Sequence, residues 1–469
     1  MGISPTTRRY LVQCAFAIIG NLIFFSEGIQ YGWASSVLPQ LSKNDSYIPI
    51  THDESKWISN CYMIGDVVGG LFSFVLFNNM SRKLSLFTSC APILLALTGI
   101  YFANSALTLC LARFVGGVGR SMNLVAIPVY IGEISNPEIR GALGTITNTI
   151  INVGIICVTA VTTYSSIGNG AILGIVFAGT AMVLIYFIPE SPYYLLMKSR
   201  KEDAEKSLKI LRQSEDVAQE LADLRIAVNR QTNENDTLFK KFVLLFTVRS
   251  NLKSAGIGTF LKSMQMFTGL SAIIMHCHTI FAQAGGSMSP PVSSLIYYSF
   301  MSLSCLFAFL LVERFTRRTL MIVSCLLTSL VLIVQGIYFY VNTLGYNLQF
   351  LSWLPVFNLV FFSISYRLGL GTVSIIMCSE IFAVNVKVAG GVLCNIAFSS
   401  SSLIANVIFD YTADAYGMYT PFWIFGGCSA MGAVITAFCL PETKGKTLDE
   451  IQCLLASGKN TKKEKNEIC

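Results

Sequence analysis

The stretch LMIVSCLLTSLVLIVQGIYFYV, residues 320–341, contains no charged side chain. A helix that crosses a bilayer needs about 20 mostly apolar residues, so this stretch is long enough to span one. Similar runs recur along the chain. Hydrocarbon offers no water to backbone N–H and C=O groups, so the runs are expected to be helices. They are continuous and long, which excludes the alternating strands of a membrane barrel.

The sequence therefore predicts an all-α membrane protein with twelve transmembrane helices in two pseudo-symmetric six-helix halves. We expect the spans near residues 11–36, 57–77, 84–104, 107–130, 143–164, 170–188, 252–282, 291–313, 320–341, 350–378, 388–409 and 419–440. The predicted organisation is an N-terminal half at 1–188, a cytoplasmic linker of short amphipathic helices at 189–250, a C-terminal half at 251–440 and a cytoplasmic tail at 441–469.

Composition supports this class of protein and excludes others. Hydrophobic residues make up 53% of the 469 residues and charged residues only 13%, whereas soluble domains carry about 25% charged residues. The net charge of +7 lies in short loops and tails, so it indicates membrane topology rather than nucleic-acid binding. No nucleophile–base set, phosphate loop or metal-ligand spacing is present, so we expect no enzyme, cofactor or metal site. The fourteen cysteines are interpreted as small buried hydrophobic residues rather than disulfides.

The distribution of Lys and Arg predicts the orientation. Arg82, Arg140, Arg317 and Lys387 fall in connections on one side, while the opposite loops hold almost no basic residue. Basic loops face the cytoplasm, so both termini are predicted to be cytoplasmic. The sequon at Asn44 then lies outside, where it can carry a glycan.

An internal repeat supports two related halves. EISNPEIR at 133–140 and EIFAVNVK at 380–387 each pair a glutamate with a base seven residues on. Arg82-Lys83 after the second span matches Arg317-Arg318 after the eighth. Two halves related by an axis along the membrane normal are typical of major-facilitator transporters.

Further motifs resemble one branch of that superfamily. PETKGKTLDEI at 441–451 follows the last span, and PESP at 189–192 follows the sixth. YIGE at 130–133, RGALG at 140–144, and Gly32-Trp33 with Leu38-Pro39 match in order and spacing. Over nearly its whole length the chain resembles the sugar-porter family, and most of all the insect facilitated trehalose and hexose transporters.

The resemblance implies a latch of charge pairs at the cytoplasmic rim, which closes the inner side when the cavity faces outward. Its members here would be Arg82, Glu133, Arg140, Glu190, Glu313, Arg317, Arg318, Glu380, Lys387 and Glu442. The alternative is ordinary solvated loop charge, with each exposed pair contributing roughly 0–1 kcal/mol.

The resemblance also implies a substrate site near the membrane midplane between the halves. The residues that match its lining are Gln265, Asn148, Ser271, His276, Ile375 and Phe398. The match is incomplete, because Ile375 stands where the family has Trp and Met301 stands where it has Asn. The turn at 369–375 lacks the family's prolines. Either other groups bind the sugar, or the substrate has changed.

Charged residues inside the spans give a second set of candidates. Arg120 and Arg367 lie thirteen residues before Glu133 and Glu380, at matching positions in the two halves, and Glu27 lies at a comparable depth. Intramembrane charges face partners or cavities because burying them alone is costly. One interpretation is a structural Glu27–Arg120 pair. The other is that an arginine meets an anionic or strongly polar substrate.

We therefore expect a plasma-membrane carrier of a small polar solute, a hexose or trehalose, working by facilitated diffusion with alternating access. Proton-linked relatives carry an Asp where this chain has Gly32, which favours uniport. The alternatives are a carrier of another polar or anionic solute, and a transporter-like sensor that binds without transporting.

Overall fold

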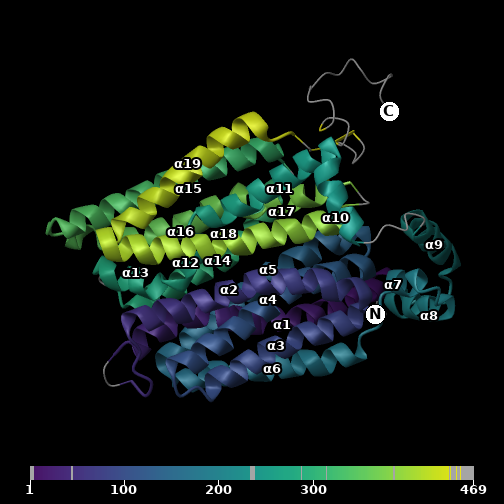
Figure 1. Cartoon of the computed structure of the whole chain (residues 1–469), viewed down its shortest axis with the longest axis horizontal. Coiled ribbons are helices and arrows are strands. Elements are labelled where there is room, and N and C mark those ends of the chain that lie inside the picture. The colour runs from purple at the N-terminus through teal and green to yellow at the C-terminus, as the bar shows by residue number, and fades with distance from the viewer. Residues whose placement is uncertain are drawn as a thin grey trace. The chain divides into compact units, whose positions relative to one another are not determined.

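The computed structural model describes residues 5–43, 46–232, 238–286, 288–312, 314–383, 386–442, 444, 450–451 and 455. Within these ranges the side chains of residues 5–6, 74–79, 137–138, 140–142, 145, 227, 229–232, 238–239, 241, 306, 308–312 and 379 are not described. All regular structure in the described part of the chain is helical (Figure 1). The chain divides into two compact units, Met1–Asp236 and Thr237–Cys469.

Unit 1 contains six long helices. They are α1 (Pro5–Leu41), α2 (His52–Asn79), α3 (Arg82–Tyr101), α4 (Ala106–Ile134), α5 (Pro137–Tyr164) and α6 (Ile167–Phe187). α2 packs along α4, α1 along α5, and α3 against both α4 and α6. The starts of three helices are fixed locally, since the side chains of Thr51, Ser81 and Ser105 each accept a hydrogen bond from a first-turn N–H, which caps the helix.

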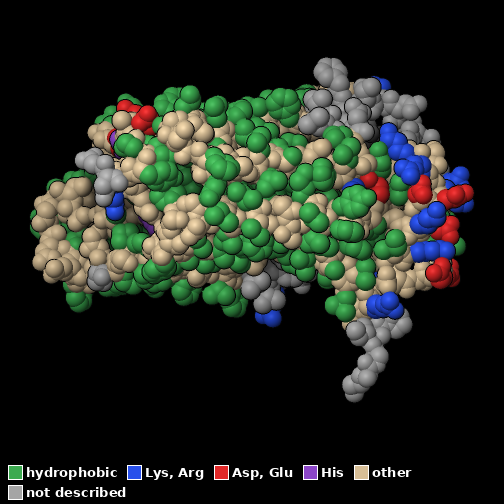
Figure 2. Space-filling view, turned by 90° about the horizontal axis from the view of Figure 1, so that it is seen from below, with side chains coloured by type: hydrophobic (Ala, Val, Ile, Leu, Met, Phe, Trp, Pro, Cys, Tyr) green, Lys and Arg blue, Asp and Glu red, His purple; other side chains and the backbone are tan. Residues whose placement is uncertain are grey.

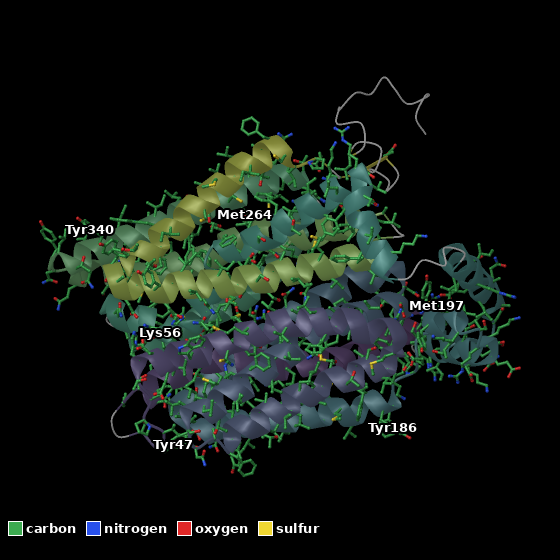
Figure 3. All side chains as sticks on the ribbon, viewed as in Figure 1. Tyr47, Lys56, Tyr186, Met197, Met264 and Tyr340 are labelled. Carbon is green, nitrogen blue, oxygen red and sulfur yellow. The ribbon has the colours of Figure 1, made fainter. Side chains whose placement is uncertain are left out.

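Three short helices follow in unit 1: α7 (Pro192–Met197), α8 (Lys201–Arg212) and α9 (Ala218–Thr232). Figure 1 shows them beyond one end of the long helices. Arg212 attaches them there, because its guanidinium donates to the Ile134 carbonyl at 3.0 Å and pairs with Glu220 at 2.7 Å. Figure 3 shows that Tyr186 and Met197 lie at this end of unit 1, whereas Tyr47 and Lys56 lie at the other.

Unit 2 begins with α10 (Leu238–Thr247) and contains six further membrane passes. These are α11 (Arg249–Phe267) with α12 (Leu270–Met275) and α13 (Cys277–Ala284); α14 (Pro290–Val312); α15 (Arg317–Thr343); α16 (Leu354–Tyr366) with η2 (Arg367–Gly371) and α17 (Val373–Glu380); α18 (Lys387–Tyr416); and α19 (Tyr419–Cys439). A short turn, η1 (Gln349–Leu351), precedes α16.

Two of the predicted spans are not single helices. The span expected at 252–282 is broken at Gly269, whose φ of +79° lies in the left-handed region that glycine adopts readily. The span expected at 350–378 contains the π-helical turn η2. Interruptions of this kind at membrane depth are tolerated where the backbone is buried in protein or lines a cavity.

The helices suit a bilayer. In the described part of the chain, nine helices are long and apolar enough to cross a membrane. The other three passes are α2, which starts with a polar turn, the broken α11–α13, and α14, whose side chains are described only in part. Figure 2 shows hydrophobic side chains over most of the face in view, with Lys, Arg, Asp and Glu gathered mainly at one end.

Candidate functional site

The first candidate feature is a set of charge pairs at the α7 end of unit 1. Arg82, at the first position of α3, pairs with Glu133 near the end of α4, with Nη2 and Oε1 3.0 Å apart. The carboxylate of Glu190 accepts the Lys83 backbone N–H at 3.2 Å. Glu190 thus lies at the N-terminus of α3, where the helix dipole favours negative charge.

Unit 2 repeats this arrangement with different residues. Arg317, at the start of α15, lies 3.9 Å from Glu380 at the end of α17. Glu442 accepts the backbone N–H groups of Arg317 and Arg318 at 3.1 and 3.2 Å. Burial raises the pKa of Glu442, but the N–H groups of Lys444, Arg318 and Arg317 outweigh it and hold the pKa below 4.5.

The remaining members of the predicted network fall into two groups. The Arg140 side chain and Glu313 lie outside the described residues. Arg318 directs its guanidinium to the Ala437 carbonyl rather than to a carboxylate, and Lys387 is exposed at the first position of α18. Every charge pair described above joins helices of the same unit. Asn44, the predicted glycan site, also lies outside the described residues.

The second feature is a buried charge cluster in the middle of unit 1. Arg120 on α4 is 7% exposed and Glu27 on α1 is 2% exposed. Arg120 Nε lies 3.2 Å from Glu27 Oε1, and Arg120 Nη1 lies 3.6 Å from Asp66 Oδ2 on α2. The guanidinium also stands 4.6 Å from the ring centre of Tyr31. The pairing interpretation of Glu27 and Arg120 is therefore confirmed, and one arginine links three helices.

A second buried arginine, Arg113, was not among the residues predicted from the sequence. Arg113 is two turns before Arg120 on α4 and fully buried. It donates to the Gln30 carbonyl and lies over the rings of Tyr62 and Trp33, at 4.2 and 5.6 Å from their centres. The signal was available, since Arg113 also interrupts an apolar run. Its aromatic partners could not be inferred, because they come from α1 and α2.

The third feature is a polar set in unit 2. Gln265 on α11 is buried and donates through Nε2 to the carbonyls of Leu370 and Gly371 in η2, at 2.8 and 3.2 Å. Its Oε1 is also buried and accepts no hydrogen bond from any described residue. The same holds for Ser399 Oγ and Asn406 Oδ1 on α18. Buried acceptors without partners are rare and call for an explanation.

Two more predicted site residues lie on the broken helix beside α18. Ser271 and Ser402 hydroxyls are hydrogen bonded at 2.7 Å. His276, between α12 and α13, lies 3.2 Å from Asp410 and stacks on Phe409 with ring centres 4.7 Å apart. The sequence did not point to Asp410, because it was placed one residue beyond the expected end of its span.

The last predicted candidates are more dispersed. Phe398 on α18 lies under Lys262, whose Nζ is 5.4 Å from the ring centre. Ile375 on α17 is 45% exposed. Asn148 is half-buried on α5 of unit 1. Arg367 opens η2 beside the ring of Tyr366 at 5.8 Å, and none of the ion pairs found among the described residues involves it. The match of Arg120 with Arg367 in sequence position therefore does not extend to their surroundings.

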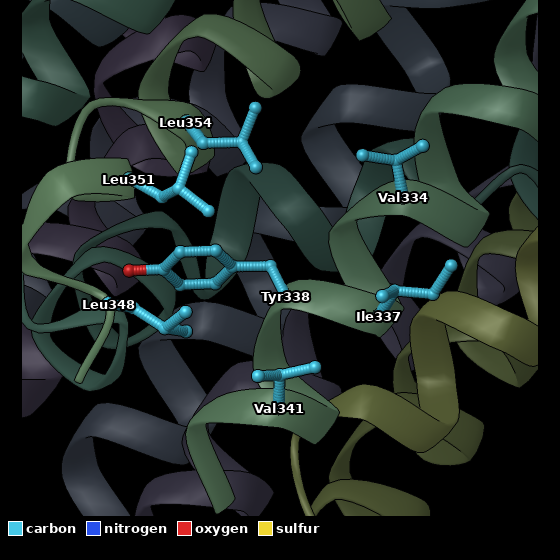
Figure 4. A pocket seen from close by; sticks show the side chains of 7 residues that line it. All are labelled: Val334, Ile337, Tyr338, Val341, Leu348, Leu351 and Leu354. Carbon is cyan, nitrogen blue, oxygen red and sulfur yellow. The ribbon is translucent and has the colours of Figure 1, made fainter. Parts of the chain in front are cut away.

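An apolar cavity of about 310 Å³ lies elsewhere in unit 2. Figure 4 shows Tyr338 of α15 among Leu348, Leu351 and Leu354. The Tyr338 hydroxyl donates to the Ala284 carbonyl at 2.9 Å, so the lining side chains offer no open polar group. A cavity of this kind does not suit a sugar, whose hydroxyls need hydrogen-bonding partners.

Two six-pass units with matching charge pairs, the second with two interrupted helices, are typical of a multi-pass membrane transporter of the major-facilitator class. The profile described as "Sugar (and other) transporter" matches residues 13–455. The chain belongs to this family, and it is a transporter and not an enzyme.

Relatives and solved structures agree. The facilitated trehalose transporter Tret1 of Bombyx mori is 28% identical over 475 residues, which cover 99% of this chain and 92% of that protein. Its namesake in Apis mellifera ligustica is 25% identical over 447 residues, covering 95% and 88%. The proton:xylose symporter XylE bound to 6-bromo-6-deoxy-D-glucose has a TM-score of 0.74 at 19% identity over 94% of this chain and 99% of that one. The inward-open xylose transporter XylE of E. coli has a TM-score of 0.76 at 18% identity, with the same coverage of both chains. These structures show the likeness of fold alone.

Proposed function

We propose that this chain carries trehalose or a hexose across the plasma membrane by facilitated diffusion with alternating access. The names of the similar insect proteins support the choice of substrate. The observation that carries most weight is the buried Oε1 of Gln265, which accepts no hydrogen bond from the described residues. A sugar hydroxyl would supply the missing donor.

The proposed binding groups combine this acceptor with the other predicted residues. Gln265 is held in place by its two bonds to η2, so its free oxygen is already oriented. Ser271, His276 and Phe398 lie on α12, on the junction after it and on α18, while Ile375 follows η2 on α17. Asn148 of unit 1 is the remaining residue that matches the family's lining in sequence. Aromatic rings pack on sugar C–H faces, and amides and hydroxyls match sugar hydroxyls.

The proposed topology has both termini in the cytoplasm, Asn44 outside and the inner charge pairs at the cytoplasmic rim. It is supported by the distribution of Lys and Arg. It is also supported by the location of the charge pairs Arg82–Glu133 and Arg317–Glu380 at the corresponding helix ends of the two units. These pairs hold α3 to α4 and α15 to α17, so each would keep the inner end of its own unit rigid as the units move.

The test is uptake of radiolabelled trehalose and glucose by proteoliposomes that contain the purified chain. Ser399→Ala removes a hydroxyl that makes no hydrogen bond within the described residues, so folding should be intact and sugar affinity should fall. Loss of one neutral hydrogen bond, about 0.5–1.5 kcal/mol, weakens binding roughly 2- to 12-fold. Gln265→Leu should act in the same direction, and Ser299→Ala, whose hydroxyl bonds to Leu295 on its own helix, is the control.

The results separate the alternatives. Flux of either sugar supports the proposal, whereas sugar binding without flux supports a sensor. Arg367, which takes part in no ion pair among the described residues, favours an anionic solute as the second candidate. In that case organic anions, and not sugars, would be taken up, and Arg367→Gln would abolish the uptake. Arg120 is not a candidate for this role, because Glu27 and Asp66 already pair with it.

A further inference from the structure

The helices α2 and α4 run in parallel and pack at very short range. A Cβ atom added to Gly65 would lie 2.0 Å from the Phe114 carbonyl oxygen and 3.1 Å from the Phe114 Cα. One added to Gly69 would lie 2.5 Å from the Val118 oxygen and 2.7 Å from its Cα. In each of these two contacts the residue numbers of the facing residues differ by 49. This repeated offset defines the register in which the two helices face each other.

The same register continues one turn toward the start of both helices. Four residues before Gly65 is Cys61, and four residues before Phe114 is Cys110. The two thiols lie close enough to interact with each other, and both cysteines are free in the structure. The cysteines are therefore directly opposed on neighbouring helices, although 48 residues lie between them in the sequence.

The close approach of the two helices beside the cysteines favours a disulfide. Disulfides join residues whose Cα atoms lie about 4.4–6.8 Å apart. The contacts at Gly65 and Gly69 bring the two backbones close together immediately below the cysteines. We therefore expect the Cα atoms of the two cysteines to lie within this range.

The pair lies near the end of unit 1 that carries the α1–α2 connection. Trp57, one turn before Cys61, is 61% exposed, and Leu107, three residues before Cys110, is 69% exposed. Both cysteines are only partly buried. In the topology proposed above, on which this inference rests, this end faces the extracellular side, where disulfides form and persist.

A second pair of neighbouring thiols, Cys378 and Cys394, provides a contrast. Cys378 lies near the end of α17 and Cys394 near the start of α18. In the same topology these ends face the cytoplasm, where thiols are kept reduced. The two pairs thus differ in the compartment that they face.

We propose that Cys61 and Cys110 form a disulfide that joins α2 to α4 at the outer end of the N-terminal half. The oxidant is a small external disulfide. One protein thiolate attacks it and releases one small thiol, and the second protein thiol displaces the other from the mixed intermediate. Two S–H bonds are lost, one protein S–S bond forms, and two small thiols leave. The bond lies within one half, so it stabilises that half without preventing transport.

The test counts oxidised cysteines in the full-length protein from intact cells. The protein is denatured in N-ethylmaleimide without reductant, then reduced, and the released thiols are labelled with a polyethylene-glycol maleimide. We expect two labels on the wild type and none on Cys61→Ser, Cys110→Ser or the double variant. Cys378→Ser is the matched control and should retain two. Reductant should also lower the melting temperature of the wild type and leave that of the double variant unchanged.

Two outcomes would overturn the inference: no label on the wild type after reduction, or two labels on the double variant. The first outcome does not depend on whether a variant folds, because it concerns the wild type alone. Sugar uptake is measured in the same preparations. Uptake without the disulfide rejects the disulfide alone, and the disulfide without uptake rejects the proposed function alone.

Discussion

At the scale of single residues, the arginine in the middle of α4 is the most tightly constrained group. Arg120 neutralises carboxylates from α1 and α2 within 3.2 and 3.6 Å, and all three are almost inaccessible to water. A buried pair gains little over apolar residues of the same volume, but breaking it leaves an uncompensated charge. The cluster therefore restricts how α1, α2 and α4 can pack.

Arg120→Gln should accordingly destabilise the protein by about 3–5 kcal/mol, which would be measured as a fall in the melting temperature of the detergent-solubilised protein. The triple variant with Glu27→Gln and Asp66→Asn should regain most of the loss, since no charge is then left without a partner. Arg8→Gln, at an exposed position on α1, is the control. A single variant as stable as the wild type would show that the cluster does not hold the helices together.

At the scale of elements, the turn η2 replaces the proline-rich turn that related carriers have in this span. Gly369 is packed so closely on α15 that an added Cβ would lie 2.3 Å from the Leu320 carbonyl oxygen. Ser324 of α15 fastens the turn, because its hydroxyl accepts the Leu370 N–H at 3.0 Å and donates to the Ser365 carbonyl at 2.6 Å. A glycine and a serine thus hold the interruption without proline.

Gly369→Ala should therefore push α16–α17 away from α15 and displace the carbonyls that orient Gln265. We expect lower yield of folded protein and, in what remains, loss of sugar uptake beyond the loss of protein. Gly391→Ala on α18, where an added Cβ meets nothing within 4 Å, should behave as the wild type. Equal uptake per folded molecule in the two variants would contradict this role of the turn.

The first turn of α15 makes a prediction about pH. Glu442 binds this turn, and its pKa is held below 4.5, so its contribution to stability is complete above that pH. The contribution is lost as the pH falls through the lower pKa of the folded state. The wild type should therefore melt at a higher temperature than Glu442→Gln from pH 7 down to about pH 4.5, and the difference should shrink below that. The Glu202→Gln variant, changed at an exposed position, should show no such difference from the wild type. A difference between the wild type and Glu442→Gln that persisted at the lowest pH would contradict the assignment.

At the scale of the whole molecule, the chain should move its substrate down a concentration gradient only. Proton-linked relatives have an Asp where this chain has Gly32, and Glu27 is engaged by Arg120. In proteoliposomes, sugar should enter until the inner and outer concentrations are equal, and an inward pH gradient should not raise the final level. Accumulation above the outer concentration, absent from liposomes without protein, would show that transport is coupled to protons.

The sequence alone predicted those properties that depend on one segment at a time. Apolar runs of spanning length and repeated motifs predicted the two sets of six membrane passes, and the family assignment confirmed the class of protein. These signals are local, because the lipid environment selects each segment by its own length and hydrophobicity. Gln265, Ser271 and His276 were predicted as site residues from the resemblance of their span to the sugar-porter family, and their role stays a prediction.

The partners of the buried side chains and the breaks within two membrane spans became known only from the tertiary structure. Arg120 pairs with residues of α1 and α2, Arg113 lies over rings of the same two helices, and Asp410 comes to His276 from α18. Ser324 of α15 is hydrogen bonded to the π-turn, and Gly65 and Gly69 let α2 approach α4 closely beside Cys61 and Cys110. Each contact joins residues far apart in the chain, and it depends on the relative rotation and depth of packed helices, which hydropathy does not specify.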